Sequence, residues 1–334
     1  MTRFQNIAVV GATGMVGSTL ISLLEERNFP VQKLYLLASD RSAGETISFH
    51  KKNYFVESIN TFDFTKTDLC FFCASNDIAE KFAPIAALHG NVVIDKSSYF
   101  RMDPDVPLVV PEVNADALRT LPKNIIASPN CTTIPLAMAL KPIYDAAGIA
   151  RMNIATYQSV SGSGRDAVDE LAEQTAQLLS GKPIKPKVYP QQIAFNVIPH
   201  IDAFEENGYT REEMKVVNES RKILDDPDLL INVTAVRVPV FFGHSIAVHL
   251  ETRDDLSLKE ALKLLGHAPG VKLFADPTRY PTPVHDAAGQ DVTFVGRVRK
   301  DISHPKGISF WVVCDNVRKG AALNAVQIAE FLNQ

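Results

Sequence analysis

A cysteine just before a predicted helix is the residue of this sequence with the clearest chemical potential. Cys131 lies in the segment 128–135, which ends in Pro135 and continues into the apolar run 136–143. Because proline is tolerated in the first turn of a helix, Pro135 places the helix start close behind Cys131. The positive end of the helix dipole favours a thiolate, and its free N–H groups can bind an oxyanion. Cys131 is therefore a candidate nucleophile, and the alternative is a small apolar core residue.

A glycine-rich turn near the N-terminus indicates a nucleotide site. Residues 6–10 form a β-branched run, and Gly11, Gly14 and Gly17 separate it from a helical pattern of leucines. This order of strand, glycine turn and helix lets the backbone approach a pyrophosphate, which then lies at the helix N-terminus. The spacing GxxGxxG is a variant of the usual dinucleotide fingerprint, and the second strand that follows strengthens the prediction.

The end of that second predicted strand, residues 34–37, bears on the choice of cofactor. Ser39, Arg41 and Ser42 follow it, and an arginine with hydroxyl groups at this position accommodates the 2′-phosphate of NADP. Asp40 lies in the same loop and could instead bind a ribose 2′-hydroxyl, as in NAD-binding proteins. We expect NADP, with NAD as the alternative.

Three further polar residues lie at positions that suit a ligand site. Arg101 follows the predicted strand 91–95 at the carboxyl end of the sheet, so it is a candidate anion holder or else a surface arginine. Lys215 lies about one helical turn after Glu212, although pairs of this spacing are mostly solvent-exposed. His244 follows a glycine in a turn between two predicted strands, where an imidazole can be catalytic or structural.

A nicotinamide site combined with a nucleophilic cysteine indicates an aldehyde-oxidising or acyl-reducing enzyme. The Cys131 thiolate would add to the carbonyl, hydride would pass to NADP, and a thioester would remain on the sulfur. His244 would handle the proton of the hydroxyl group. Water can resolve a thioester directly, whereas phosphorolysis needs an anion site beside the cysteine, which Arg101 and Lys215 would supply.

The composition is that of a globular enzyme and excludes several other classes. The chain has 334 residues, of which 46% are hydrophobic and 22% charged, and its net charge of -4 offers no basic face for nucleic acid. Glycines interrupt the apolar N-terminal run, so we expect neither a signal peptide nor a membrane span. Four cysteines without a secretory signal indicate the cytoplasm. Cys70, Cys73 and Cys314 lie inside apolar strand patterns, so no metal site is predicted.

The elements that must position these residues suggest two domains. Strands at 6–10, 34–37, 68–72 and 91–95 alternate with helices, which predicts an α/β protein with a Rossmann-like, doubly wound parallel sheet. We expect this NADP-binding domain to span residues 1–130 and to be completed by residues 315–334. Residues 131–314 would form an α+β catalytic domain, with strands at 153–160, 233–240, 245–251 and 308–314 and helices at 168–178 and 210–224.

Seven segments, in this order, resemble those of one enzyme family. They are GATGMVG (11–17), ASDRSAG (38–44), DKSSYFR (95–101), SPNCTT (128–133), YQSVSGSGR (157–165), RVPVFFGH (237–244) and DNVRKGA (315–321). Along essentially its whole length the chain resembles aspartate-semialdehyde dehydrogenase. The resemblance implies reversible conversion of L-aspartate 4-semialdehyde, inorganic phosphate and NADP to 4-phospho-L-aspartate and NADPH. The reverse reaction serves the biosynthesis of lysine, threonine, methionine, isoleucine and diaminopimelate.

The resemblance also implies roles for individual residues. Cys131 would carry the acyl thioester, His244 would act as acid/base, and Gln158 would orient the substrate near the thiol. Arg237 would hold the substrate α-carboxylate, and Glu212 would meet its amino group. The residues implied for phosphate are Arg101, Asn130 and Lys215, and those implied for NADP are Gly11, Thr13, Gly14, Met15, Val16, Ser39, Arg41, Ser42, Ser161, Gly162 and Asn316. A homodimer built through the second domain is also implied, and tetramers are possible.

Two other functions compete with this one. N-acetyl-γ-glutamyl-phosphate reductase has similar architecture and chemistry but acts on a longer, acetylated substrate. A free amino group needs an acidic partner such as Glu212, whereas an acetamide does not. A non-catalytic NADP-sensing protein would bind the cofactor but would not need a reactive thiol at Cys131.

Overall fold

The computed structural model describes residues 4–334, which divide into two compact units. The first unit contains the chain up to Asn130 together with Ala321–Gln334, and the second is Cys131–Gly320. The sequence placed the return to the first domain at Asp315, which is too early by this division. The reason is that Asp315 Oδ2 accepts the backbone N–H of Gly289 at 2.7 Å, a bond within the second unit.

The first unit is a sheet of seven strands with helices on both faces. The strand order is β3-β4-β2-β1-β5-β6-β7, and neighbours are parallel except for β3 and β4. The strands are β1 (Asn6–Val10), β2 (Lys33–Ala38), β3 (Thr46–Phe49), β4 (Lys52–Ser58), β5 (Leu69–Phe72), β6 (Val92–Asp95) and β7 (Ile125–Ala127). The helices are α1 (Met15–Glu26), α2 (Asn76–Leu88), α3 (Pro111–Asn114) and α8 (Leu323–Leu332). The predicted doubly wound parallel sheet is confirmed.

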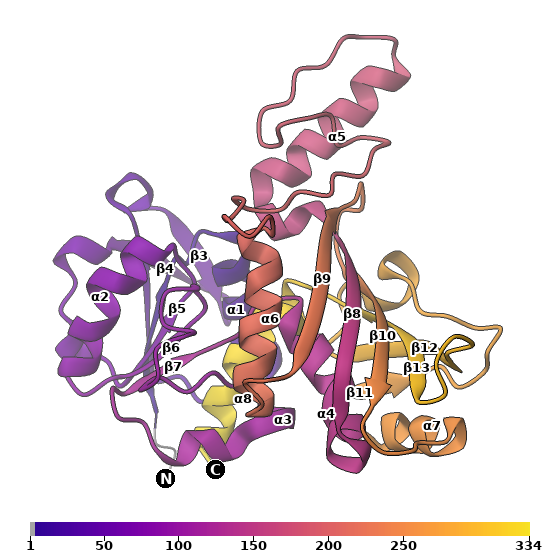
Figure 1. Ribbon diagram of the computed structural model, residues 1–334. Helices are drawn as coiled ribbons and strands as arrows, with labels where there is room; N and C mark the ends of the chain where they lie inside the picture. The colour runs from indigo at the N-terminus through magenta and orange to yellow at the C-terminus, as the bar shows by residue number, and fades with distance from the viewer. Residues whose placement is uncertain (1–3) are drawn as a thin grey trace. The chain divides into compact units, whose positions relative to one another are not determined.

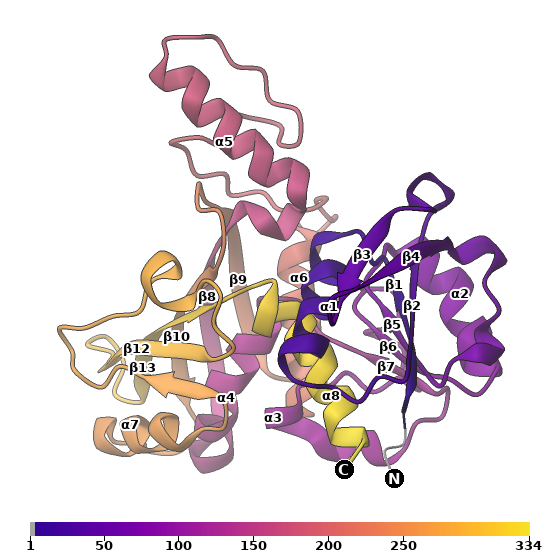
Figure 2. The ribbon, with the colours of Figure 1, turned by 180° about the vertical axis from the view of Figure 1, so that it is seen from behind.

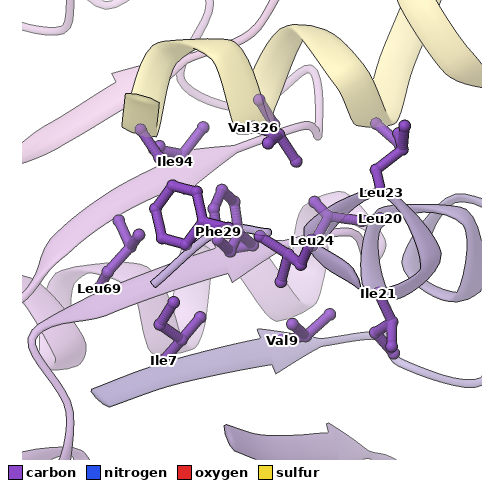
Figure 3. Close-up of a cluster of buried hydrophobic side chains, with 14 of the residues drawn as sticks. Ile7, Val9, Leu20, Ile21, Leu23, Leu24, Phe29, Leu69, Ile94 and Val326 are labelled. Carbon is purple, nitrogen blue, oxygen red and sulfur yellow. The ribbon is translucent and has the colours of Figure 1, made fainter. Parts of the chain in front are cut away.

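The core of the first unit lies between the sheet and the pair α1 and α8. Leu20 and Leu24 of α1 are one turn apart and fully buried, as expected of the apolar face of a surface helix. Figure 3 shows them together with Ile7 and Val9 of β1 and with Val326 of α8. Both ribbon views place α2 on the other face of this sheet (Figures 1 and 2). The C-terminal helix therefore belongs to the core of the first unit.

The second unit is a mixed sheet of six strands in the order β11-β12-β13-β10-β8-β9. Strands β8 and β9 are parallel, as are β11 and β12, and the other neighbours are antiparallel. The strands are β8 (Ile149–Gln158), β9 (Leu230–Arg237), β10 (His244–Thr252), β11 (Val271–Leu273), β12 (Thr293–Lys300) and β13 (Gly307–Cys314). The helices are α4 (Thr133–Ala147), α5 (Arg165–Leu179), α6 (Arg211–Leu224) and α7 (Leu258–His267).

Three helices bury one face of the six-stranded sheet. Leu136, Leu140 and Ile143 of α4 belong to a core cluster with residues of α6, α7 and the central strands. Figure 1 shows α4 and α6 along this face, while α5 and the loop after it project beyond the ends of β8 and β9. None of the helices described between residues 4 and 334 is long and apolar enough to cross a membrane.

Two strands of the second unit end earlier than the sequence predicted, and both differences concern the site. The predicted strand 153–160 ends at Gln158, because residues Val160–Ser163 form a 3-10 turn. The predicted strand 233–240 ends at Arg237, because Pro239 lacks the N–H that a ladder requires. His244, predicted in a turn, is the first residue of β10.

Candidate functional site

The turn between β1 and α1 has the backbone that a dinucleotide site needs. Gly11 has a φ of +80°, and a Cβ on it would lie 2.4 Å from the carbonyl oxygen of Cys73. A Cβ on Gly17 would lie 2.1 Å from the carbonyl oxygen of Gly11, so helix and turn pack too closely for a side chain. Gly14 is the N-cap, and α1 begins with the uncharged residues Met15 and Val16. This positive helix end fits a pyrophosphate.

The acidic residue of the loop after β2 is hydrogen-bonded to the end of β4 and the turn after it. Asp40 accepts hydrogen bonds from the Ser58 hydroxyl and, at 3.0 Å, from Asn60 Nδ2. Both carboxylate oxygens of Asp40 are thus engaged by β4 and the turn after it. In the same loop Ser39 and Arg41 are exposed and Ser42 is buried.

Arg101 is a buried arginine, so it is not the surface residue that the sequence left as an alternative. Its side chain is 7% exposed, and it donates from Nε to the carbonyl of Ser128 at 3.1 Å and from Nη2 to the carbonyl of Lys96 at 2.8 Å. Ser128 begins the segment that contains Asn130, itself 7% exposed, and continues into Cys131. Arg101 therefore holds the chain that leads into the candidate nucleophile.

Cys131 lies at the start of a helix, as predicted. Helix α4 begins at Thr133 with Thr132 as its N-cap, and Pro135 is in its first turn. Cys131 is a free cysteine of intermediate exposure, so it is not sealed in the core. A Cβ on Gly320 would lie 3.0 Å from the carbonyl oxygen of Cys131 and 3.3 Å from its Cβ, so a side chain there would crowd Cys131.

Four strand ends bring the other candidate residues into one row. Gln158 ends β8 and is paired with Arg237, which ends β9. His244 begins β10, the strand on the other side of β8, and is paired with Cys314 at the end of β13. Gly320 lies against both Cys131 and Asp315, the residue after Cys314, since a Cβ on it would lie 3.0 Å and 3.3 Å from their carbonyl oxygens. Cys131 is therefore near the end of β13, at this edge of the sheet.

Helix α6 adds an acidic residue to this edge. Its N-terminus has the predicted capping box, in which the Thr210 hydroxyl accepts the N–H of Glu213 at 3.3 Å. Glu212 in the first turn is 5% exposed and its Oε1 accepts from Gln158 Nε2 at 3.1 Å. Lys215 Nζ lies 3.3 Å from Glu212 Oε2 and 2.8 Å from Asp202 Oδ2. Glu212 is therefore buried against Gln158, whereas Lys215 is partly exposed and links Glu212 to Asp202.

One residue, Ser159, holds both Arg237 and His244. Its carbonyl oxygen accepts from Arg237 Nη1 at 2.7 Å, and its backbone N–H donates to His244 Nδ1 at 3.1 Å. Burial, and then the positive charge of Arg237, hold the pKa of His244 well below its ordinary value. The ring is therefore neutral at pH 7. Among residues 4–334, His244 Nε2 and Arg237 Nε are buried atoms without a hydrogen-bond partner, so both are available to a ligand.

Gly162 lies directly against these two side chains. A Cβ on it would lie 2.9 Å from Arg237 Nη1 and 3.3 Å from His244 Nε2. We expect Gly162→Ala to displace both groups and to lower kcat/KM by about 10²-fold, since errors near 1 Å in an active site have effects of that size. Steady-state kinetics with Gly266→Ala as the control check this, because a Cβ on Gly266 meets only a side-chain atom at 3.6 Å. Equal kinetics for the two variants would contradict it.

Ser161 and Asn316, which the sequence assigned to the cofactor, also bond to the residues around His244. Asn316 Oδ1 lies 3.1 Å from the hydroxyls of both Ser159 and Ser161 and accepts the N–H of Gly243 at 2.9 Å. The sequence did not single out Ser159, although it directly follows Gln158. Gly320 was not singled out either, although it lies in the segment 315–321, which is one of the seven segments that carry the family resemblance.

The candidate residues divide between the two units. In the first unit the set comprises the glycine turn with Thr13, the loop 39–42, Arg101 and Asn130. In the second unit it comprises Cys131, Gln158, Ser161, Gly162, Glu212, Lys215, Arg237, His244 and Asn316. The glycine turn and the loop 39–42 suit a nucleotide, and the buried groups around Gln158 and Arg237 suit a carbonyl substrate that carries charged groups.

Comparison with known proteins gives the same division of the chain. Residues 6–121 match a family model described as the NAD binding domain of semialdehyde dehydrogenase. Residues 140–319 match one described as the dimerisation domain of semialdehyde dehydrogenase. The fold and the site therefore define an oxidoreductase of the semialdehyde dehydrogenase class.

Individual relatives are similar along the whole chain. The aspartate-semialdehyde dehydrogenase of Shewanella sp. (strain DB6705) is 57% identical, with 99% of this chain and 98% of the relative covered. That of Legionella pneumophila is 54% identical over 100% of this chain and 97% of the relative. A crystal structure of aspartate semialdehyde dehydrogenase II from Vibrio cholerae, complexed with ASA, is 54% identical and superposes with a TM-score of 0.96 over 99% of this chain and 98% of that one. The chain belongs to the aspartate-semialdehyde dehydrogenase family.

Proposed function

We propose that this chain converts L-aspartate 4-semialdehyde, phosphate and NADP to 4-phospho-L-aspartate and NADPH, and that the reverse reaction serves biosynthesis. The observation that carries the proposal is the row of Gln158, Arg237 and His244 at one sheet edge, next to Glu212 and to the helix-start cysteine. A cationic fork, a carboxylate and a thiol are the groups that a small amino-acid aldehyde requires. The Vibrio cholerae relative, described in complex with ASA, supports the same substrate.

In the oxidative direction the chain's own groups act in sequence on the substrate carbonyl. The Cys131 sulfur adds to the aldehyde carbon and the carbonyl becomes an oxyanion. His244 contacts that oxygen and acts as the acid/base for its proton. The nicotinamide cofactor, for which the glycine turn is proposed, would supply the hydride acceptor for this carbon. Cys131 then carries a thioester, and a phosphate oxygen attacks its carbonyl carbon and releases the thiolate.

Arg237 and Glu212 can fix the amino-acid end of the substrate. Arg237 Nη1 is already bonded to the Ser159 carbonyl, so the edge formed by Nε and Nη2 remains for two parallel bonds to the α-carboxylate. Glu212 supplies a buried carboxylate for the α-amino group. Holding both groups orients the aldehyde over the sulfur and lowers the barrier to attack.

The test of this function is phosphate-dependent reduction of NADP with aspartate semialdehyde. We expect continuous NADPH formation with phosphate, and without phosphate a burst of about one NADPH per site because the thioester then accumulates. N-acetylglutamate semialdehyde serves as the comparison substrate and should react far more slowly. Absence of NADPH formation with aspartate semialdehyde, or a preference for the acetylated substrate, would refute the proposal.

For phosphate we propose Arg101, Asn130 and Lys215. Arg101 is buried beside the Ser128 carbonyl, and Asn130 directly precedes Cys131 in the chain. Although burial raises the pKa of Asp202, the bond from Lys215 holds it below its usual value. Lys215 thus forms ion pairs with Asp202 and Glu212. A bound phosphate would interact with the same ammonium group as these two carboxylates.

For the cofactor we propose NADP in preference to NAD. The support is that Ser58 and Asn60 engage both oxygens of Asp40, whereas Arg41 is exposed in the same loop. A guanidinium group can form two hydrogen bonds to a 2′-phosphate. The Asp40 carboxylate repels that phosphate less when its oxygens are hydrogen-bonded to other residues.

Replacing Arg41 with alanine tests this preference. We expect the KM for NADP to rise about 10- to 100-fold, the effect of losing a hydrogen bond to a charged group, while the KM for NAD changes little. Steady-state kinetics with both cofactors measure the effect. Arg119→Ala is the control, because that exposed arginine of the first unit pairs with Asp116. Equal changes with NADP and NAD would contradict a role for Arg41 at the 2′-phosphate.

We also propose that two chains form a homodimer through the sheet face opposite α4 and α6. This face carries the ring pair of Tyr157 and Trp311, whose centroids lie 5.4 Å apart, beside a cavity of about 400 Å³ lined in part by Tyr280 and Pro281. An apolar sheet face with a hollow suits a second protein surface. The dimerisation domain matched by residues 140–319 supports the proposal.

Replacing Trp311 with arginine tests the dimer. We expect wild-type protein to sediment at about twice the chain mass of 36.7 kDa and Trp311→Arg to sediment as single chains, because a buried unpaired charge opposes association. Leu88→Arg, which changes an exposed leucine of the first unit, should leave the mass unchanged. A monomeric wild-type protein would refute the proposal.

A further inference from the structure

The backbone of Ser159 determines which ring nitrogen of His244 can carry a proton. Ser159 is fully buried, and its N–H lies 3.1 Å from His244 Nδ1. A backbone N–H can only donate, so Nδ1 must accept. A neutral imidazole that accepts at Nδ1 carries its proton at Nε2.

A second backbone group fixes the orientation of the Asn316 amide. The N–H of Gly243 points at Asn316 at 2.9 Å, so the atom that it meets must be the carbonyl oxygen Oδ1. The other end of the amide is then Nδ2, which donates to Ser161 Oγ at 3.0 Å. The amide is 3% exposed, so these protein contacts determine its orientation.

Two hydroxyls connect this amide to the imidazole. Ser161 Oγ lies 3.0 Å from Ser159 Oγ, and Ser159 Oγ lies 3.1 Å from His244 Nδ1. Because Asn316 Nδ2 donates to Ser161, Ser161 can donate to Ser159, and the Ser159 hydroxyl can share the single lone pair of Nδ1 with the Ser159 N–H. Both hydroxyls also lie 3.1 Å from Asn316 Oδ1. If both hydroxyls donated to Asn316 Oδ1 instead, Ser159 Oγ could accept a proton from the ring. In that arrangement, however, the backbone N–H of Ser159 would face a second N–H at Nδ1, which is unfavourable.

The surroundings of the ring keep it neutral on balance. Burial and then the charge of Arg237, which lies on β9 across β8 from His244, oppose a second proton, whereas a backbone hydrogen bond of Gly243 acts in the opposite sense and raises the pKa of His244. Nε2 is buried without a partner among residues 4–334 and lies, like Arg237 Nη1, against Gly162. The proton-bearing side of the imidazole therefore faces the guanidinium that is proposed to hold the substrate.

We propose that Asn316, Ser161 and Ser159 form a directed hydrogen-bond chain that holds His244 with its proton on Nε2, so that His244 meets the substrate oxygen as an N–H donor. The three residues are positioning residues that act through His244. The inference deepens the proposed function, on which its catalytic part rests. In the oxidative direction the Nε2–H stabilises the oxyanion that forms when the thiolate adds, and in the reductive direction it stabilises the one that hydride addition creates.

The first test is the tautomer itself, read by nitrogen NMR of full-length protein labelled with ¹⁵N-histidine. The His244 signals are identified by their loss in His244→Gln. We expect a neutral ring with the proton on Nε2 at pH 7, in the absence of substrate. A proton on Nδ1, or an imidazolium, would overturn the inference.

The second test reverses the direction of the chain with Asn316→Asp. A carboxylate accepts where the amide donated, so the hydroxyls should turn and Nδ1 should gain a proton. We expect the titration of His244 to move up by about one to three pH units, as for an imidazole coupled to a carboxylate. The acidic limb of the kcat profile should move with it. An unchanged titration would overturn the inference.

Ser159→Ala tests whether the hydroxyl carries the coupling. It keeps the backbone N–H, so the Nε2 tautomer should persist, but in the double variant Ser159→Ala with Asn316→Asp the pH shift should shrink to less than half. A full shift in the double variant would show that the charge acts directly and would refute the chain. If Asn316→Asp fails to fold, Ser161→Ala replaces it. This variant removes the donor to Ser159 and so weakens the hydrogen bond that stabilises the neutral ring, so the His244 titration should move upward, and no movement would overturn the inference.

The matched control is Ser309→Ala. Ser309 is a buried serine whose hydroxyl lies 3.0 Å from Nδ1 of another histidine, His249, on the same sheet. It should change the His249 signals and leave those of His244 in place. The tautomer test uses no substrate, so its failure differs from failure of the proposed function: an active enzyme with a proton on Nδ1 refutes the inference alone, and an inactive one with the Nε2 tautomer refutes the function alone.

Discussion

Cys131→Ala should abolish turnover, with kcat lowered by at least about 10⁴-fold, because alanine cannot carry the acyl group and loss of a covalent nucleophile has effects of this size. The position explains the reactivity. Cys131 directly precedes the N-cap of α4, and it is partly exposed, whereas Cys70 and Cys314 are buried. Phosphate-dependent NADPH formation measures the loss, and calorimetric titration should show that NADP still binds.

The control for this variant is Cys70→Ala. Burial raises the pKa of the Cys70 thiol to about 12, so it remains a neutral core group at pH 7. We expect the wild-type kcat for Cys70→Ala with some loss of stability. If Cys131→Ala retained the wild-type rate, or if it lost NADP binding together with turnover, the assignment of Cys131 as the nucleophile would be wrong.

Arg237→Lys should lower kcat/KM for aspartate semialdehyde by about 10²-fold, since one charged hydrogen bond is worth roughly 1.5–3 kcal/mol and a lysine cannot reproduce the second bond of the fork. Arg237 is 4% exposed, and its Nη1 bond to the Ser159 carbonyl fixes the guanidinium plane. The single ammonium group of lysine could bond to that carbonyl or to the substrate carboxylate, but it could not reproduce both contacts at once. Steady-state kinetics with varied aspartate semialdehyde measure the effect.

Arg151→Lys is the matched control for this variant. Arg151 is an exposed arginine near the opposite end of β8, where it is paired with Glu251. We expect its kinetics to equal those of the wild type. The KM for NADP should be unchanged in both variants, and a rise confined to NADP in Arg237→Lys would move Arg237 out of the proposed substrate site.

Much of the fold followed from residues whose backbone chemistry acts locally. Gly11 and Gly17 leave no space for a Cβ, and Pro135 is confined to a first helical turn, so strand, turn and helix starts could be predicted from them. The capping box at Thr210 was predicted for the same reason. The strands β3, β4, β7, β11 and β12 and the helices α3 and α7 were not predicted. Of these, β3, β7 and β11 are edge strands of three or four residues, which carry little pattern of their own because their neighbours supply most of their stability.

The residues of the site divide in the same way. A helix-start cysteine and a phosphate-binding turn are properties of a few consecutive residues, so the order of amino acids was enough to find Cys131 and Gly11. The meeting of Gln158 with Glu212 and the central place of Ser159 depend on which strands become neighbours. Strand order results from packing between distant segments, and no short window of the chain contains that information. The state of the His244 proton depends on it as well, because the Ser159 N–H faces the ring only once β8 and β10 pair.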